Sequence, residues 1–553
     1  MRAALKSEIH PVLLGAGCTT AAGDSIAATW DGIVSGKNFA RAVDARAWAV
    51  SPRFEPRACL WGDSENSEMT SQSRLVAKTL IAYREALTEL PMDARARIRD
   101  GRRLGVILAT TKGAIDDEIW KGDDARLERD FFSPILEDVL RADELHPARK
   151  TCISNACASA LSALAHARSW LSSGEIDDVL VLAVDRIGPF VLHGFHSLRA
   201  VTADVPRPFA TDRSGLLLGE ASAALFLSRF PGEFSVTGIG VDAEGFAVTR
   251  SSETGASLRA ACENATASGS PNLIIAHGTA TEVNDPIEAR VLAELFPKGD
   301  IPITASKGAI GHTLGASGAI DLLLARESMR RGLAFTISQT TEVDPKFSGN
   351  FLVSPSQNSV SLVPGDYSRV LVTSLGFGGI HAAAMLERAT IFPEARVANI
   401  PSATASDTHA FVFPVTTAPP WAANVERWYQ LDAYAFGMAD AAYAWRRDPA
   451  PELVFLASPG GSNATDSEFA RAGARSPALF VHSLPNVRSS AFCQVLNWHG
   501  PLYCLQHDPA TFAEATEEAR RDFRLSGRNT WVIGIETDPN GYVVRRFRIG
   551  ASA

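Results

Sequence analysis

Short, continuously apolar segments separated by helical segments constrain the fold of this chain more than any other feature. The segments "LGVILA" (104–109) and "VLVLAV" (179–184) lack the alternation of a half-buried strand. Such strands are buried on both faces, as in parallel sheets covered by helices. An amphipathic helical pattern over 71–90 precedes them, and another helical segment lies between them. The order predicts a layered α/β domain.

The totals describe a globular chain with more than one folding unit. Its 553 residues exceed one ordinary core, so two or three domain-sized units are expected. Hydrophobic residues make up 46% and charged residues 21%, which is ordinary for a globular protein. The formal net charge of -9 argues against nucleic acid as the main partner. This net charge is still compatible with a local basic patch that binds an acidic carrier.

The cysteines and the first residues predict a cytoplasmic protein. Seven cysteines are scattered along the chain without a CxxC pair, and no His/Cys cluster has metal-ligand spacing. The opening "MRAALKSEIH" contains Glu8 and His10 and no long apolar region, so we expect no signal peptide. No apolar run approaches the length of a membrane span.

The composition changes late in the chain, and the last section resembles part of the first. A stretch rich in Pro, Ala, Ser and Thr predicts a linker at 391–424 between domains 1–390 and 425–553. "LVFLASPGG" can be laid on "GVILATTKG", and "TWVIGIE" on "VLVLAVD", at an offset of about 350 residues. This predicts a partial, degenerate copy in which Asp508 stands at the position of Cys157. The alternative is a general similarity among α/β segments.

Cys157 is the first candidate for chemistry, in "TCISNACASALSALAHARSW" (151–170). A strand-like run turns into a helix there, and a helix N-terminus favours the thiolate over the thiol. The small neighbours Ala156 and Ala158 leave access to the sulfur. The alternative is a small buried cysteine that begins a core helix.

Two histidine-containing segments supply possible partners. His277 directly follows the apolar strand "NLII", at the place where α/β sheets bind ligands, and Thr279 and Thr281 add two hydroxyls. Lys307 and His312 flank a glycine-containing turn in "SKGAIGHTLGASGAIDLL". The alternative, if each segment is taken alone, is that His277 is an ordinary loop histidine, Lys307 a surface lysine and His312 a helix-capping histidine.

A glycine-rich turn forms the fourth candidate segment, "TSLGFGGIH" (373–381). Its glycines surround Phe377 and can direct a backbone N–H at an oxyanion, while the phenyl ring acts as a movable cover. The alternative is a plain hairpin turn.

Taken in order, these four segments resemble the β-ketoacyl synthase family over about residues 8–390. The segment "RPFATDRSGLLLGEASAALFL" (207–227) adds the family's Arg-Pro-Phe…Asp-Arg…Gly-Glu pattern. Cys157, His277 and His312 match the Cys-His-His pattern of its decarboxylating, elongating members. Cys-His-Asn and a second C-terminal cysteine, found in related branches, are not matched.

The resemblance implies a fold and a reaction. The fold is a thiolase-like five-layer α/β/α/β/α sandwich of two similar halves, here with a C-terminal α/β extension. Cys157 would accept an acyl chain, with the amides of Cys157 and Phe377 as oxyanion hole. His277 and His312 would stabilise the enolate left when malonyl-carrier protein loses CO2. The product would be a β-ketoacyl chain in fatty-acid, polyene or polyketide synthesis.

The resemblance also assigns the remaining residues and the partners. Lys307, with Glu288, would order the site electrostatically, and Thr279 and Thr281 would hold the phosphopantetheine arm of an acyl carrier protein. Phe377 would gate malonyl binding, with Gly378 also in contact with substrate. No metal or redox cofactor is implied, and a homodimer or a heterodimer with a second synthase-like subunit is expected.

Departures from the pattern keep two alternatives open. Leu375 stands where elongating members often have Phe, and "GGIH" replaces a common Gly-Gly-Thr-Asn. One alternative is a non-catalytic, chain-length-factor-like partner of another synthase. The other is an acyltransferase that does not decarboxylate. In each case the C-terminal segment is expected to be a structural or partner-recruiting module.

Overall fold

A computed structural model describes most of the chain as a mixed α/β protein. The described residues are 9–43, 55–62, 69–117, 119, 130–245, 252–388, 402–425, 427–458, 463–506, 511–538 and 541–551. Of the helices in these ranges, none is both long and apolar enough to cross a membrane.

Most of the described strands belong to one 16-stranded sheet. Their spatial order is β13 (Asn350–Phe351), β11 (Pro302–Thr304), β10 (Leu273–Ile275), β15 (Arg369–Gly376), β16 (Ile380–Arg388), β9 (Phe234–Ala243), β1 (Val12–Thr20), β8 (Ala221–Ser228), β6 (Asp178–Asp185), β4 (Leu104–Ala109), β5 (Arg149–Ile153), β19 (Leu502–Leu505), β18 (Leu453–Ala457), β20 (Thr530–Asp538), β21 (Gly541–Ala551) and β17 (Ser402–Phe411). Two small sheets add β2 (Arg41–Ala42), β3 (Arg57–Cys59) and β7 (Leu218–Gly219), and β12 (Leu333–Phe335) with β14 (Leu362–Pro364).

Helices cover the sheet. They are α1 (Ile26–Val34), α2 (Ser71–Glu89), α3 (Met92–Asp100), α4 (Ser133–Ala142), α5 (Ser159–Ser172), α6 (Pro189–Ser197), α7 (Ala256–Ala265), α8 (Asn284–Leu295), α9 (Lys307–Ile310), α10 (Ser317–Arg331), α11 (Ala433–Trp445), α12 (Asn463–Arg471), α13 (Pro477–His482), α14 (Arg488–Leu496) and α15 (Thr511–Ser526). Short 3-10 turns include η4 (Ala156–Ala158) and η8 (Pro485–Val487).

The predicted fold class is confirmed, because helices lie between and outside two arms of the sheet. One arm contains Cys157's neighbouring strands β5, β4, β6, β8 and β1, and the other contains β9 and β16. Helix α5 packs on β4 and β6 of one arm and on β9 and β16 of the other, and α10 packs against it. Helix α2 covers β1 and β8 from outside, and α7 covers β9 and β16. The two apolar strands foreseen from the sequence are central: every residue of β4 and β6 is buried. Burial on both faces explains their lack of alternation.

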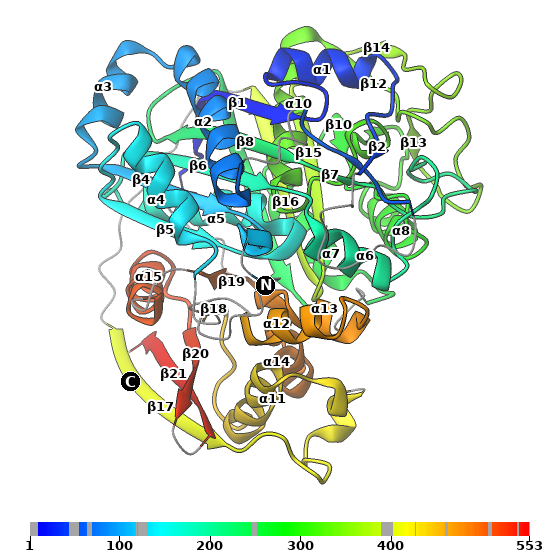
Figure 1. Cartoon of the computed structure of the whole chain (residues 1–553). Coiled ribbons are helices and arrows are strands. Elements are labelled where there is room, and N and C mark those ends of the chain that lie inside the picture. The colour runs from blue at the N-terminus through cyan, green and yellow to red at the C-terminus, as the bar shows by residue number, and fades with distance from the viewer. Residues whose placement is uncertain are drawn as a thin grey trace.

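The C-terminal unit (residues 402–551 as described) repeats the strand arrangement of the cysteine-containing arm. The order β5-β4-β6-β8-β1 in that arm is matched by β19-β18-β20-β21-β17, with parallel and antiparallel neighbours in the same sequence. The cysteine-containing arm meets the C-terminal unit where β5 and β19 run antiparallel, with Ile153 opposite Leu505. In Figure 1 the yellow-to-red C-terminal elements lie together at that side of the blue and cyan arm.

The predicted linker, 391–424, is wrong in its second half. Residues 402–411 form the edge strand β17, which pairs with β21 over ten residues. Polar and small residues alternate only in "SATAS", and the following "DTH" is polar throughout, so the segment fits an exposed edge strand as well as a linker. The C-terminal unit therefore includes residues before 425, and it shares a sheet with the preceding domain. Residues 391–401 and Asp508 lie outside the described residues.

A buried ion pair joins the C-terminal unit to the rest of the chain. Lys112 Nζ lies 2.6 Å from Asp466 Oδ1 and donates to the Ser483 carbonyl at 2.7 Å. The two side chains are 4% and 2% exposed. Removing one partner of such a pair leaves a buried charge uncompensated. We expect Lys112→Met to lower the free energy of unfolding by about 3–5 kcal/mol in urea titrations.

The double variant Lys112→Met/Asp466→Leu is the control for this prediction. It removes both charges, so it should recover most of the lost stability. A loss below about 1 kcal/mol in the single variant would contradict a buried, paired role for Lys112.

Candidate active site

Cys157 lies in a tight turn between β5 and α5. The turn η4 contains it, and α5 begins two residues later, at Ser159. Ala156 has a φ of 48°, a left-handed conformation that reverses the chain just before the cysteine. Strained residues of this kind cluster at functional sites.

The C-terminal unit holds the residue just before this turn. The Asn155 side-chain amide donates to the Leu502 carbonyl at 2.9 Å, and its oxygen accepts from the Cys504 N–H at 3.0 Å. Both ends of the Asn155 amide are therefore bound by β19. The position of the cysteine turn depends on a strand about 350 residues away in sequence.

The sulfur of Cys157 faces two backbone N–H groups. The N–H groups of Cys157 itself and of Phe377 both interact with it. The Ser374 hydroxyl donates to the Cys157 carbonyl at 2.8 Å, which ties the cysteine turn to the end of β15. Two converging N–H groups are the arrangement that an oxyanion hole requires.

The predicted preference for a thiolate is wrong for this conformation. Cys157 is only 4% exposed, and burial, reinforced by the negative charge of Asp185, raises the pKa of its thiol to about 12. The positive charge of Lys307 and the two N–H groups act in the opposite direction but do not outweigh burial. The helix start is visible in the sequence, but the burial of the Cys157 sulfur is not. Burial removes water from the thiol and so disfavours the thiolate.

This pKa predicts how Cys157 reacts with iodoacetamide. Only the thiolate reacts, so the alkylation rate of the resting protein should rise about tenfold per pH unit from pH 7 to 9.5. Peptide mass spectrometry would assign the modified cysteine. A rate that is already constant with pH near neutrality would contradict the raised pKa.

His277 and His312 face each other beside this turn. Their ring centroids are 5.0 Å apart at an interplanar angle of 86°, and the residues are 1% and 2% exposed. The Leu314 N–H donates to His312 Nδ1 at 3.1 Å, which assigns the proton of the neutral ring to Nε2. Within the described part of the chain, neither ring nitrogen of His277 has a well-aligned hydrogen-bond partner.

Both imidazoles are held neutral. Burial, followed by the nearby positive charge of Lys307, lowers the pKa of His277 and of His312 well below the usual value. A neutral imidazole carries one N–H and one unprotonated nitrogen. The pair can therefore donate hydrogen bonds to a carbonyl or enolate oxygen without bringing a full positive charge.

Lys307 forms its ion pair with a residue that the sequence analysis missed. Its Nζ lies 3.2 Å from Asp321 Oδ2, and the Ser306 hydroxyl donates to the other oxygen of Asp321 at 2.6 Å. Glu288 instead accepts from the backbone N–H groups of His277 and Gly278 at 2.8 and 2.9 Å. Lys307 acts on Glu288 only through the field of its charge.

Glu288 therefore holds the His277 loop in place. The Thr373 hydroxyl donates to the same carboxylate at 2.5 Å, so the loop is tied to β15 as well. Asp321 follows Lys307 by fourteen positions, one turn into α10, and no sequence signal singled it out.

The two threonines of the His277 loop lie together. Their hydroxyl oxygens are 3.0 Å apart, and Thr281 is half-buried while Thr279 is buried. Asp285 accepts from the Thr279 N–H at 3.0 Å and fixes the loop at the start of α8. The hydroxyl pair thus has one member within reach of solvent, as an amide-containing ligand arm would need.

Phe377 stands at the tip of the β15–β16 turn. It is half-buried, and its ring centroid lies 5.5 Å from that of Phe195 in α6. Gly378 and Gly379 follow with φ of 81° and 72°, conformations that favour glycine. The structure thus brings Cys157, the two histidines, Lys307 and the Phe377 turn to one buried centre.

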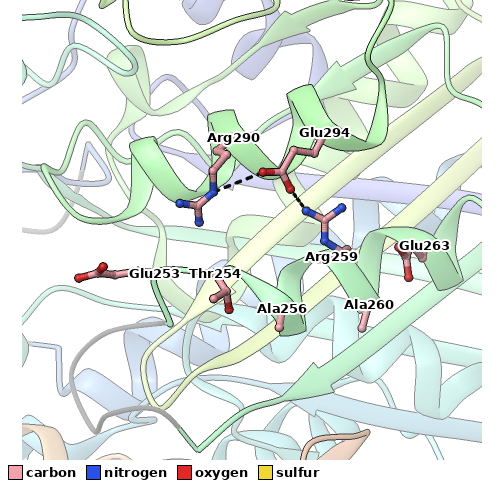
Figure 2. A pocket seen from close by; sticks show the side chains of 8 residues that line it. All are labelled: Glu253, Thr254, Ala256, Arg259, Ala260, Glu263, Arg290 and Glu294. Carbon is pink, nitrogen blue, oxygen red and sulfur yellow. Dashed lines mark ion pairs between the residues drawn. The ribbon is translucent and has the colours of Figure 1, made fainter.

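A surface hollow of about 610 Å³ lies elsewhere, along α7 and α8 (Figure 2). Arg259 of α7 and Arg290 of α8 both pair with Glu294 there. It contains none of the predicted site residues; its lining is Glu253, Thr254, Ala256, Arg259, Ala260, Glu263, Arg290 and Glu294. Among the described residues, no three His, Cys, Asp or Glu side chains are grouped to hold a metal ion.

Two family models match the part of the chain that contains this centre. Residues 147–231 match the β-ketoacyl synthase N-terminal domain, and residues 234–340 match the β-ketoacyl synthase C-terminal domain. The first includes Cys157 and the second includes His277, Lys307 and His312.

Two curated relatives resemble this chain over part of its length. The tetracenomycin polyketide synthase ketoacyl synthase alpha subunit of Streptomyces glaucescens is 25% identical in an alignment 429 residues long, gaps included, which covers 69% of this chain and 98% of the relative. The 3-oxoacyl-[acyl-carrier-protein] synthase 2 of Mycobacterium leprae (strain TN) is 26% identical in an alignment 321 residues long, gaps included, which covers 51% of this chain and 74% of the relative.

One solved structure matches almost the whole chain. It is the "PfaC Keto synthase-Chain length factor", with a TM-score of 0.75, 14% identity, and coverage of 98% of this chain and 78% of that one. At this identity the match concerns the fold alone. It extends over the C-terminal unit, beyond the 69% of the chain that the Streptomyces relative covers.

Proposed function

This chain belongs to the β-ketoacyl synthase family, and from that premise we propose that it is a condensing enzyme that carries an acyl chain on Cys157. The observation that carries the proposal is the close pair of imidazoles, His277 and His312, whose ring centroids lie 5.0 Å apart, beside a cysteine turn that the Ser374 hydroxyl ties to β15.

The first step in this proposal is transfer of an acyl group from a carrier thioester to Cys157. The sulfur attacks the thioester carbon, and the two N–H groups stabilise the oxyanion of the tetrahedral intermediate. The new C–S bond to Cys157 replaces the C–S bond to the carrier, and the cysteine proton ends on the carrier thiol. Because burial raises the pKa of the Cys157 thiol, its proton leaves during the attack and not beforehand.

The second step is decarboxylative condensation. A malonyl thioester loses CO2, and the electron pair of the broken C–C bond forms an enolate whose oxygen is stabilised by N–H groups of His277 and His312. The enolate carbon attacks the acyl thioester on Cys157. A C–C bond forms, the C–S bond to Cys157 breaks, and water returns a proton to the sulfur. Loss of CO2 supplies the driving force.

The proposed substrate carrier is an acyl carrier protein in fatty-acid or polyketide synthesis. The paired hydroxyls of Thr279 and Thr281 suit the amides of its phosphopantetheine arm. A second synthase-like subunit was also expected from the resemblance. The edge of β5 that does not pair with β4 is, however, already paired with β19 of the same chain. Such a subunit would therefore have to dock elsewhere.

One observation favours a second candidate function. Cys157 is buried and its thiol pKa is raised, as expected of a chain-length-factor-like partner that has no need of a nucleophile. The candidates differ in whether the cysteine ever becomes acylated.

Intact-mass analysis distinguishes the two candidates. The full chain is incubated with carrier proteins that bear acyl chains of different lengths. We expect a mass increase of one acyl group, which peptide mapping assigns to Cys157. No mass increase with any chain length, together with activation of another synthase, would favour the non-catalytic partner.

A further inference from the structure

The active-site turn that contains Phe377 is held by a residue of the C-terminal unit. Asn486 lies in η8 and is 1% exposed, and its side-chain N–H donates to the Phe377 carbonyl at 2.8 Å. Within the described residues its side-chain oxygen has no hydrogen-bond partner, so the Phe377 turn is the one group that the amide binds. Burying an amide is costly unless its hydrogen bonds are made.

The packing around this hydrogen bond leaves little room for the turn to move. Val481, Leu484 and Val487 form a buried cluster with Ala156, the neighbour of Cys157, and Phe377 packs against that cluster. A Cβ at Gly378 would lie 3.0 Å from Asn486 Nδ2 and 3.2 Å from Val487. Glycine at 378 therefore allows the C-terminal segment to approach the turn closely.

Segment 480–487 is itself anchored to the part of the chain that contains Cys157. The Ser483 carbonyl accepts from Lys112 Nζ at 2.7 Å, and the Phe480 ring centroid lies 5.5 Å from that of Phe195 in α6. The Ser489 hydroxyl donates to the Asn486 carbonyl at 2.6 Å and closes the turn that presents the side chain. Asn486 is thus a fixed donor rather than a mobile surface amide.

The two halves of the oxyanion hole proposed above therefore depend on the same C-terminal unit. β19 binds both ends of the Asn155 amide, next to the cysteine turn, and Asn486 binds the carbonyl of Phe377, whose N–H faces the sulfur. We propose that Asn486 is a positioning residue through which the C-terminal unit fixes the Phe377 peptide groups for catalysis. This inference rests on the proposed condensing function.

The test compares Asn486→Leu with wild type by hydrogen–deuterium exchange and by kinetics. Leucine is close in size and joins an apolar cluster, but it removes the donor to the Phe377 carbonyl. We expect amides in a peptide covering 374–381 to exchange about tenfold faster. We expect kcat for condensation to fall about 10- to 100-fold, with KM for the carrier substrates within about twofold.

Asn424→Leu is the matched control, because Asn424 belongs to the same unit and is exposed. It should leave both exchange and kcat unchanged. If Asn486→Leu does not fold, Asn486→Ala carries the same expectations. Unchanged exchange and kcat in a folded Asn486 variant would overturn the inference. Faster exchange in a protein whose wild type does not condense would uphold the positioning role and refute the proposed function.

Discussion

Replacing Cys157 with alanine is expected to abolish acyl loading and to lower condensation on the order of 10⁴-fold or more. Alanine removes the sulfur that we propose to form the thioester and leaves the turn intact, since Ala156 and Ala158 already flank the position. The measurement is intact mass after incubation with an acyl-carrier thioester, together with the rate of β-ketoacyl product formation.

Cys262→Ala is the matched control for this variant. Cys262 is another fully buried cysteine, in α7, and burial likewise raises the pKa of its thiol. The control should load and condense like wild type. Acyl loading of Cys157→Ala equal to that of wild type would refute the assignment of the nucleophile.

The second large effect is expected at the two histidines, and it separates the two steps of the reaction. His277→Ala and His312→Ala should still take an acyl group on Cys157, because the proposed oxyanion hole consists of backbone N–H groups and not of imidazole groups. Each should lower decarboxylation and condensation by about 10²–10³-fold, since each removes one donor to the enolate oxygen. Acyl loading and CO2 release are measured on the same preparation.

His409→Ala provides the control, because His409 lies in the C-terminal unit, where it pairs with Asp440 at 2.8 Å. It should leave both steps unchanged. If either active-site histidine variant lost acyl loading and condensation to the same extent, the two rings would serve the first step, and their assignment to the enolate would fail.

The buried strands were predictable from sequence, because their environment leaves a local trace. Every residue of β4 is buried; Val106 and Leu108 join one core cluster, whereas Ile107 and Ala109 join another. A strand that packs on both faces must be apolar throughout. Strand β17 was missed because its small and polar residues fit an exposed linker as well as an edge strand, and pairing with β21 decided between them.

The residues of the candidate site were predictable from motifs, but their charge states and supports were not. The helix start beside Cys157 is visible in the sequence, whereas the burial that raises the thiol pKa depends on segments distant in the chain. Lys307 was found, but its ion-pair partner Asp321 was not. Asn486 carries no local signal, since its role exists only where the C-terminal unit meets the Phe377 turn.

The central claim is that one chain both binds an acyl group on Cys157 and uses it to capture a decarboxylated malonyl unit. The most direct measurement supplies the acyl-loaded protein with malonyl-carrier protein labelled in its free carboxyl group. The account predicts that labelled CO2 and a carrier-bound β-ketoacyl chain form in equal amounts while the acyl mass on Cys157 disappears. Persistence of the acyl mass with no release of labelled CO2 would contradict it.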